Sequence, residues 1–353
     1  MMPYLVSILA FVFSISAASS QSLLTDVAYG SGPAQKLDVY PSATPNSPLI
    51  VLIHGGAWVG GSKNDLTELA SFLQDAGYTV SSIDYRLSWQ ATFPANIQDV
   101  ACALTHLRSN AAAYNADTSR VALLGYSAGG HLAMLQATAG KKYQACEPEV
   151  DLRLDAMIGV CGIYDFKYRA IGEPDRLLQM LGDSALYWDE ADPMQHLDDV
   201  GATKFLLLNA AIDHIVPPQN TYDLYDSLRT RGVLVEQRTF YAKDHLDILS
   251  TVSPNDSVIS TITDYLARLW PQSKVTLDTV THDVDINFRG RTIQLYSRHD
   301  GKIVIYNLLG QVVTTIEVAA GISEHYLWNV PYGCYFISVL TNDRRTTARV
   351  ILD

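Results

Sequence analysis

Strongly apolar stretches alternate with amphipathic stretches along most of the chain, up to about residue 271. Apolar runs typical of buried strands lie at 48–54, 79–84, 120–125, 156–162, 204–210 and 233–240. Helical patterns lie between or after them, at 66–75, 95–110, 222–230 and 257–269. Because such alternation forms parallel sheets covered by helices on both faces, this part of the chain predicts an α/β fold with a mostly parallel central sheet.

The pattern changes after the segment WPQSK at 270–274. Short strands of alternating polarity follow, and no helical pattern is found among them; they lie at 292–297, 302–307, 311–318 and 334–341. Glycine-containing turns separate these strands, as in small antiparallel sandwiches. The sequence therefore predicts a first domain at 21–272 and a small all-β sandwich at 276–353, with a boundary near 272–276.

The first twenty residues resemble a secretory signal peptide. An apolar core runs from Leu5 to Ile15 and is too short to span a bilayer comfortably. Small residues follow at 17–20, as signal cleavage requires, although no Lys or Arg precedes the core. A buried N-terminal helix is the alternative. We therefore expect a signal peptide at 1–20, a secreted or cell-surface protein, and no transmembrane segment.

The charge and the cysteines narrow the class of protein further. The net charge is −12, and residues 1–274 hold 18 Lys and Arg against 29 Asp and Glu. No basic stripe is visible, which argues against a nucleic-acid partner. Export permits disulfides, and three full pairings are open to the four cysteines, Cys102, Cys146, Cys161 and Cys334. Their spacing matches no metal site, and a buried free thiol is the default expectation for each, most clearly for Cys161.

One segment changes from a buried strand to a helix through a turn of small residues. In VALLGYSAGGHLAMLQA (121–137), Ser127 stands in the pattern G-x-S-x-G between an apolar run and a helical run. A side chain at Gly125 or Gly129 would collide with so tight a turn. The following helix would point its positive N-terminal end toward a developing oxyanion. The segment predicts that Ser127 is a nucleophile.

A serine nucleophile needs a base and an acid that orients the base. In this architecture the acid follows a late strand and the histidine follows the last one. Asp213 lies in the loop after 204–209, and His245 lies five residues after Phe240, so we expect these two residues to complete a triad. Asp165, after an earlier strand, is the alternative acid. Other candidates are assigned to packing, capping or surface positions: His131, His106, His196, His214 and Asp247.

An oxyanion hole needs two or more N–H groups. Ala128, the residue after the nucleophile, is expected to supply one, and the small residues of LIVLIHGGAWVGGSKND (49–65) allow a substrate oxygen to approach the main chain. We expect His54 to fix this loop by hydrogen bonds.

Several motifs carry a family resemblance. HGGAW, DYRL (84–87), FPANIQD (93–99), GYSAGGHLA, DHIVPP and DHLDIL occur in the order and spacing of α/β-hydrolases. Residues 48–270 resemble the hormone-sensitive-lipase-like esterases, above all feruloyl-esterase-like hydrolases and kynurenine formamidases. The resemblance implies Ser127, His245 and Asp213 as the triad and places the oxyanion hole at Gly56, Ala57 and Ala128. It implies no metal and no organic cofactor.

Two features modify this resemblance. Many relatives have a third glycine where Ala57 stands, but its backbone N–H survives the change. Relatives also carry a longer N-terminal cap, so the roof of the pocket must come from elsewhere. The segment 163–199 could supply aromatic walls, or it could be simple cap packing; its large side chains are Tyr164, Phe166, Tyr168, Met180, Tyr187, Trp188 and Met194.

The tail resembles the C-terminal sorting domain of type IX secretion over roughly 280–353. The stretches IVIYNLLGQVV, YGCYFISV and DRRTTARVILD carry this match. A carbohydrate-binding module is the rival interpretation, with an aromatic platform built from Tyr326, Trp328, Tyr332 and Tyr335.

The leading hypothesis is a secreted serine carboxylesterase that cleaves short-chain or aromatic acyl esters through an acyl-enzyme. Its expected partners are a small or polysaccharide-linked ester and the type IX secretion machinery. Alternatives on the same scaffold are an arylformamidase-like activity, a peptidase, and a non-catalytic surface protein that binds carbohydrate.

Overall fold

The structure is a computed structural model that describes most of the chain. The described residues are 22–168, 174–182, 187–271, 284–289, 292–297, 300–307, 311–327, 330, 333–341 and 344–352. The predicted signal peptide at 1–20 and the predicted boundary at 272–276 lie outside these residues. Within the described part, no helix combines the length and the apolar character that crossing a membrane requires.

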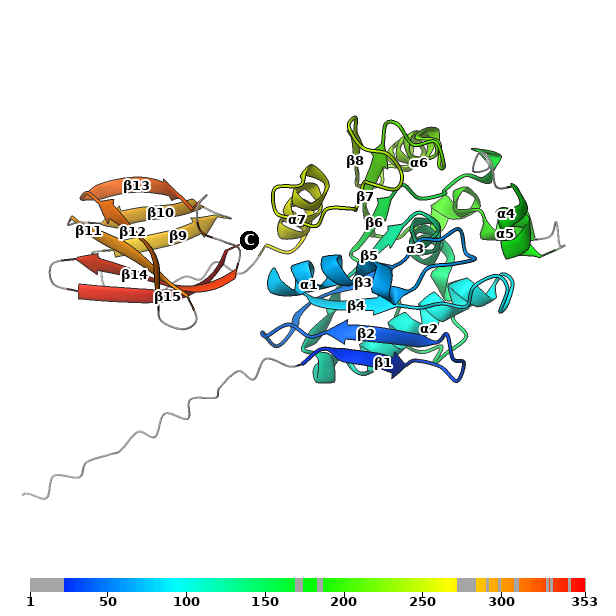
Figure 1. The fold of residues 1–353 in the computed structure, drawn as a ribbon, viewed down its shortest axis with the longest axis horizontal. Coiled ribbons are helices and arrows are strands. Elements are labelled where there is room, and N and C mark those ends of the chain that lie inside the picture. Colours follow the sequence, from blue (N-terminus) through cyan, green and yellow to red (C-terminus); the bar gives the residue numbers. More distant parts are fainter. Residues whose placement is uncertain are drawn as a thin grey trace, which may run out of the picture.

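An eight-stranded sheet forms the centre of the larger part of the chain (Figure 1). Its order is β1-β2-β4-β3-β5-β6-β7-β8, and all neighbours from β4 to β8 run parallel. The strands are β1 (Leu24–Ala28), β2 (Lys36–Tyr40), β3 (Ser47–Ile53), β4 (Thr79–Ile83), β5 (Ala116–Tyr126), β6 (Ala156–Val160), β7 (Lys204–Ala210) and β8 (Val235–Phe240). This confirms the predicted α/β fold with a mostly parallel sheet.

Helices cover both faces of this sheet. On one face pack α2 (Ala95–Ser109), α3 (Ala128–Ala139) and α6 (Gln219–Thr230), and on the other pack α1 (Thr67–Asp75) and α7 (Ser257–Leu269). Strand alternation divides the core in the same way, because successive side chains of a strand point to opposite faces. In β3, Leu49 and Val51 belong to the first core, whereas Ile50 and Leu52 belong to the second.

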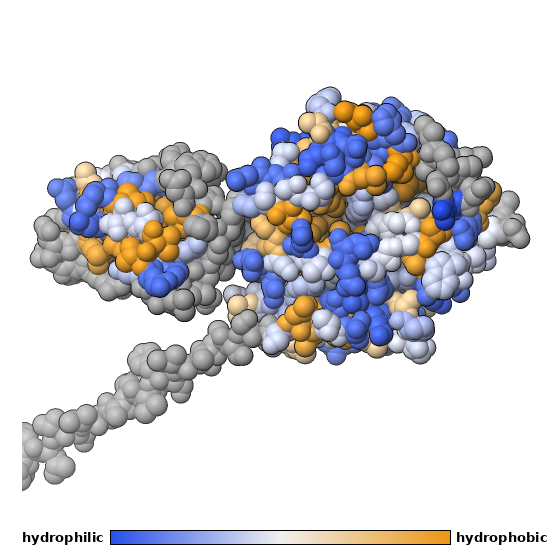
Figure 2. Space-filling model, in the orientation of Figure 1, coloured by the Kyte–Doolittle hydropathy of each residue, from blue (hydrophilic) through white to orange (hydrophobic). Residues whose placement is uncertain are grey.

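Shorter elements connect the strands and helices. They are α4 (Pro174–Leu181), α5 (Tyr187–Ala191) and the 3₁₀ turns η1 (Lys63–Leu66), η2 (Ala111–Tyr114), η3 (Gly140–Tyr143), η4 (Phe166–Tyr168) and η5 (Pro193–Asp199). On the face of the molecule drawn in Figure 2, hydrophilic residues alternate with small hydrophobic areas.

The sequence pattern did not predict β1 and β2. β1 is an edge strand whose residues are mostly exposed, so it has no apolar signal. In β2, the buried Asp38 interrupts the apolar run. Its carboxylate is tolerated there because Lys63 Nζ lies 2.9 Å from Asp38 Oδ1 and 3.0 Å from Oδ2.

The C-terminal part is a sandwich of two antiparallel sheets, as predicted. Their orders are β13-β10-β9 and β12-β11-β14-β15. The strands are β9 (Val284–Arg289), β10 (Thr292–Ser297), β11 (Gly301–Tyr306), β12 (Val312–Val318), β13 (Gly321–Tyr326), β14 (Gly333–Thr341) and β15 (Arg344–Leu352). Both sheets contribute to one apolar core, for example through Leu295 and Ile337. Tyr335 belongs to this core and is 7% exposed, so it cannot serve in an aromatic platform. The side chains of Tyr326, Trp328 and Tyr332 lie outside the described residues.

Two of the cysteines are joined, which corrects the expectation of free thiols. Cys102 in α2 forms a disulfide with Cys146, which follows η3. The two residues are 44 positions apart in the sequence, and only the packing of α2 beside this segment brings them together. Cys161 is a buried free thiol, as expected. The side chain of Cys334 lies outside the described residues.

Candidate active site

Ser127 lies at a sharp turn between β5 and α3. Its backbone has φ 55° and ψ −119°, a conformation that is costly for a residue other than glycine. Its N–H is held by a 2.9 Å hydrogen bond to the carbonyl of Val160. The neighbouring glycines are required by space: a Cβ at Gly125 would lie 2.2 Å from the carbonyl oxygen of Gly129, and one at Gly129 would lie 2.1 Å from that of Ile53. The predicted collision is thus confirmed.

Three side chains from separate loops form one hydrogen-bonded chain at the carboxyl edge of the sheet. His245 Nε2 lies 2.9 Å from Ser127 Oγ, and His245 Nδ1 lies 2.7 Å from Asp213 Oδ2. All three residues are buried. Asp213 follows β7 and His245 follows β8, the positions that the sequence indicated. A histidine that contacts a hydroxyl and a carboxylate in this way can take a proton from the first while the second orients it.

Backbone groups fix the acid and the histidine. Asp213 Oδ1 accepts hydrogen bonds from the N–H groups of Ile215 and Val216, at 2.9 and 2.7 Å. Tyr126 Oη donates to the carbonyl of His245 at 2.6 Å. Sequence reasoning missed this role of Tyr126, although the residue stands inside the G-x-S-x-G pattern.

The loop that carries His245 is closed by two aspartates. Asp247 Oδ1 accepts the N–H of Asp244 at 2.7 Å, and Asp244 Oδ1 accepts the N–H of Leu246 at 2.8 Å. Lys243 Nζ lies 3.1 Å from Asp256 Oδ2 and 3.2 Å from the carbonyl of Asp247. Asp247 therefore closes a turn of this loop and does not cap a helix.

The predicted oxyanion donors line the turn beside Ser127. Gly56 and Ala57 follow β3 with φ of 104° and 51°, and Ala128 begins α3. Within the described residues, no acceptor takes the N–H groups of Gly56, Ala57 or Ala128. The first N–H groups of a helix have no partner inside it, and the N-terminus carries partial positive charge. These groups are available to a negatively charged oxygen.

Buried histidines support the oxyanion loop. His131 Nδ1 accepts a 3.2 Å hydrogen bond from Trp58 Nε1, so Nε2 carries the proton and donates to the carbonyl of Ala191 at 2.8 Å. Burial lowers the pKa of His131 to about 4. His54 Nδ1 donates to the carbonyl of Gly55 at 2.7 Å, and its ring stacks on Tyr85. Both histidines have the structural roles that the sequence suggested.

The alternative candidates interact elsewhere. Asp165 Oδ2 lies 2.7 Å from Lys167 Nζ, and its Oδ1 accepts the N–H of Lys167. His106 Nε2 lies 3.0 Å from Tyr114 Oη, and His196 Nε2 lies 2.9 Å from the carbonyl of Glu190. Both histidines are half-buried, and His214 is exposed.

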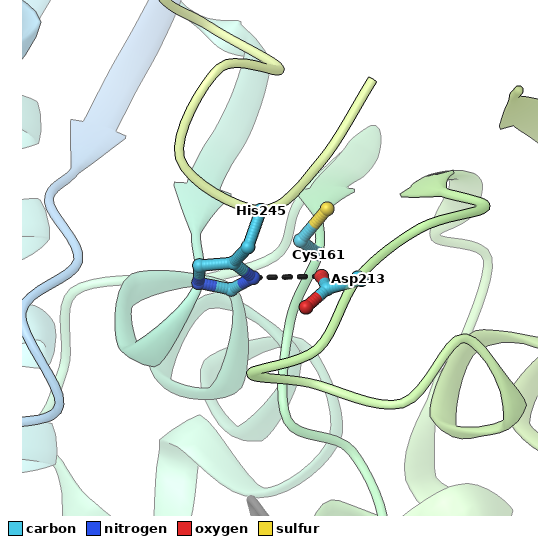
Figure 3. Close-up of side chains that lie close together, drawn as sticks. All are labelled: Cys161, Asp213 and His245. Atoms are coloured by element: carbon cyan, nitrogen blue, oxygen red, sulfur yellow. Dashed lines mark hydrogen bonds and ion pairs between the residues drawn. The ribbon is translucent and has the colours of Figure 1, made fainter. Parts of the chain in front are cut away.

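Cys161 is a neighbour of the triad that sequence reasoning missed. Its Sγ, an oxygen of Asp213 and a nitrogen of His245 all lie within 4.8 Å of one another (Figure 3). Burial, followed by the charge of Asp213, raises the pKa of this thiol, so it remains protonated. A metal ion here would have to deprotonate Cys161 and break the bond between His245 and Asp213. The arrangement therefore fits hydrogen bonding better than metal binding.

The segment 163–199 supplies core packing at three of its expected pocket residues. Tyr164, Phe166 and Met180 are at most 3% exposed, so they cannot form pocket walls, and the packing alternative holds for them. Phe166 stacks on His131 with ring centroids 5.4 Å apart and meets Trp188 edge-on at 5.9 Å. The half-buried members of the set are Tyr168, Tyr187, Trp188 and Met194.

Comparison with known proteins assigns both parts of the chain. The BD-FAE family model matches residues 37–228, just over half of the sequence. The chain belongs to the BD-FAE family. The model of the secretion system C-terminal sorting domain matches residues 280–353, so this BD-FAE protein also carries the sorting domain that its tail resembles.

Individual relatives of the BD-FAE chain are named as esterases. Esterase LipC of Mycobacterium tuberculosis (strain ATCC 25618 / H37Rv) is 32% identical over 219 residues, which cover 58% of this chain and 54% of LipC. The chain thus spans about half the length of this relative.

Among solved structures, a truncated carbohydrate esterase from gut microbiota has a TM-score of 0.63 at 21% identity, over 73% of this chain and 99% of that one. A bifunctional GH43-CE protein of Bacteroides eggerthii has a TM-score of 0.60 at 27% identity, over 70% of this chain and 38% of that one. The first of these likenesses, at so low an identity, shows the fold alone.

Proposed function

We propose that this BD-FAE protein is a secreted serine carboxylesterase, with Ser127 as nucleophile, His245 as base and Asp213 as the acid that orients it. The observation that carries the proposal is the hydrogen-bonded chain from Ser127 Oγ through His245 to Asp213 Oδ2, at 2.9 and 2.7 Å. The names of the curated relatives support an ester as the substrate.

The reaction follows from this geometry. His245 Nε2 takes the proton of Ser127 Oγ as that oxygen attacks the ester carbonyl. The N–H groups of Gly56, Ala57 and Ala128 stabilise the oxyanion, and Asp213 stabilises the imidazolium. His245 then returns the proton to the leaving alkoxide. Water, deprotonated by the same nitrogen, hydrolyses the acyl-enzyme and releases Ser127.

The proposed acyl group is short or compactly aromatic, and the ester is small or attached to a polysaccharide. Half-buried aromatic residues of 163–199, such as Tyr187 and Trp188, support a compact acyl site. The titles of two structural neighbours name carbohydrate-esterase units, which supports a carbohydrate as the alcohol. An ester panel should therefore show acetyl to butyryl and feruloyl esters as good substrates and emulsified long-chain triglycerides as poor ones. N-formylkynurenine and peptide substrates on the same panel test the arylformamidase-like and peptidase alternatives.

Labelling tests the nucleophile directly. An alkyl phosphonate ester that inactivates serine hydrolases should add once to the protein, and peptide mass spectrometry should place it on Ser127. Ser127→Ala should neither react nor hydrolyse phenyl acetate. Ser260→Ala, on α7 and away from the site, is the control and should behave as wild type. A label on another residue, or activity retained in Ser127→Ala, would overturn the proposal, and a protein without any hydrolysis would favour the non-catalytic alternative.

We further propose export, with a signal peptide at 1–20, the hydrolase domain at 21–272 and a sorting domain at 276–353. The sorting-domain match at 280–353 and the disulfide between Cys102 and Cys146 support it, because disulfides persist in oxidising compartments. The type IX secretion machinery would be the partner of the tail. Deletion of 276–353 should retain the protein in the periplasm of its native host. If the truncated protein still reaches the medium but no longer binds an insoluble polysaccharide, the tail is instead a carbohydrate-binding module.

A further inference from the structure

A groove borders the candidate active site and has no part in the proposed triad. It has a volume of about 600 Å³. One wall is the oxyanion loop at Gly55 and Gly56, the second is the segment 64–69 at the start of α1, and the third is the segment after His245, from Leu246 to Val252. Tyr126, next to Ser127, also lines it.

The groove is continuous with the reacting groups. A Cβ at Gly55 would lie 3.1 Å from Ser127 Cβ, so this wall abuts the nucleophile. Tyr126 donates to the carbonyl of His245, and the two rings are 5.4 Å apart. A group attached to the ester carbonyl can therefore enter the groove directly from Ser127.

The third wall decides which part of the ester the groove holds. His245 returns its proton to the leaving alkoxide, so the alcohol departs beside the imidazole. Leu246, Leu249 and Val252 continue the chain from His245 and form the apolar side of the groove. The acyl group, in contrast, stays bonded to Ser127 Oγ. The groove is thus placed to receive the alcohol part.

The polar side of the groove is acidic. Asn64, Asp65, Thr67, Glu68 and Ser250 line it, and none of its lining residues is Lys, Arg or His. Asp65 accepts the N–H of Ser62 at 3.0 Å and so has a capping partner. The carboxylate of Glu68 lies on the exposed side of α1. The nearest cation of the His245 loop, Lys243, is paired with Asp256.

We propose that this groove is the alcohol subsite and that it selects by charge. It takes hydroxylated alcohols that are neutral or cationic and discriminates against anionic ones, such as alcohols with a carboxylate or phosphate. Glu68 and Asp65 supply the negative field, and Asn64, Thr67 and Ser250 supply partners for hydroxyl groups. The proposal rests on the proposed esterase function.

Esters with one acyl group and alcohols of matched shape test it. Acetylcholine and 3,3-dimethylbutyl acetate differ by one positive charge, and O-acetylglycolate carries a negative charge. We expect kcat/KM to be highest for the cation and lowest for the anion, with about two- to fivefold between cation and neutral ester at low salt, as for exposed ion pairs. The ratio should fall as ionic strength rises.

Variants assign the preference to the groove. Glu68→Gln should reduce the ratio between cation and neutral ester, and Glu68→Lys should invert the order toward the anion. Asp75→Asn removes the same charge from the exposed far end of α1 and should leave the ratio unchanged. An equal ratio in wild type and Glu68→Lys would overturn the proposal.

A steric variant separates the alcohol from the acyl group. Ser250→Trp should raise KM for bulky acetate esters and leave the preference between acetyl and butyryl esters of one alcohol as it is. A changed acyl preference would show that the groove holds the acyl group, which overturns the assignment. Loss of phenyl acetate hydrolysis in the wild type would refute the esterase function itself, whereas hydrolysis without charge preference would refute the subsite alone.

Discussion

The carboxyl edge of the eight-stranded sheet and the C-terminal sandwich both consist of buried apolar strands, but their backbones and polar groups differ. At the edge, four residues other than glycine have positive φ: Ala57, Trp58, Ser127 and Cys161. Buried polar side chains gather there as well, namely His54, Ser127, His131, Asp213 and His245. In the described part of the sandwich, positive φ occurs at Gly321 alone, and the buried polar side chains are Ser297 and Ser338.

The difference shows how one chain distributes strain. Positive φ at non-glycine residues costs about 1–3 kcal/mol each and persists where the surrounding structure enforces it. The edge holds its strained residues through long-range hydrogen bonds, such as Ser127 N–H to Val160 and Cys161 N–H to Leu208. The sandwich needs no such constraint, because regular antiparallel pairing satisfies its backbone. Substitutions should therefore act on activity at the edge and on stability in the sandwich.

The largest expected effect is on activity at the edge. Asp213→Asn should lower kcat/KM for phenyl acetate by about 10⁴-fold, because the amide would hold His245 in the wrong tautomer. The free energy of unfolding should change far less. Asp165→Asn, the matched control at the same edge, should stay close to wild type because Asp165 pairs with Lys167. Steady-state kinetics check both variants, and the reverse pattern would make Asp165 the acid.

The next effect compares two glycines with no side-chain function. Gly125→Ala should prevent folding or destabilise by more than about 3 kcal/mol, since its Cβ would lie 2.2 Å from the backbone oxygen of Gly129. Gly321→Ala should cost only about 1 kcal/mol, because it has φ 120° but no atom within 4 Å of the added Cβ. Denaturant unfolding measures both. Equal costs would show that the two regions resist strain alike.

The sequence predicted the parallel sheet and the loops that carry Ser127, Asp213 and His245, because continuous apolar runs mark buried strands and chemistry follows their carboxyl ends. It could not predict β1, whose residues are exposed, or β2, where the buried Asp38 needs Lys63 as a partner. In the tail, β9, β13 and β15 were missed because short polar strands resemble loops.

Contacts between distant segments were also beyond the sequence. Cys161 lies near Asp213 only because β6 pairs with β7. The disulfide of Cys102 with Cys146 depends in the same way on packing. The aromatic residues of 163–199 showed that the segment is apolar, but not which side chains face the core.

The third prediction uses pH to probe a buried polar group at the edge. Burial lowers the pKa of His131 to about 4, below the value near 6.5 of an unfolded histidine. Between these values the unfolded state binds more protons, so the stability contributed above pH 6.5 is lost as the pH falls toward 4. The loss is on the order of 3 kcal/mol.

His131→Gln is the variant that measures this loss. A glutamine can still accept from Trp58 and donate to the carbonyl of Ala191, but it does not titrate. The free energy of unfolding of wild type, relative to His131→Gln, should decrease from pH 7 to pH 4. Asp192, whose pKa burial raises to about 6, acts in the opposite direction but is present in both proteins and cancels. A constant difference across this range would show that His131 does not titrate as its burial requires.

The smallest expected effect isolates the strain at the nucleophile itself. Ser127→Gly and Ser127→Ala both remove the hydroxyl, so both should be inactive, and their difference in stability reports on the backbone alone. Glycine adopts positive φ without steric cost, which offsets the larger entropy that it loses on folding, so we expect Ser127→Gly to be more stable than Ser127→Ala by about 1 kcal/mol. The same pair at Ser260, inside the helix α7, should give the opposite sign, because glycine is about 1 kcal/mol worse than alanine in a helix. Urea unfolding of the four variants measures the contrast. If glycine is the less stable residue at both positions, the turn at Ser127 stores no strain, and the difference between the two regions lies in their polar groups alone.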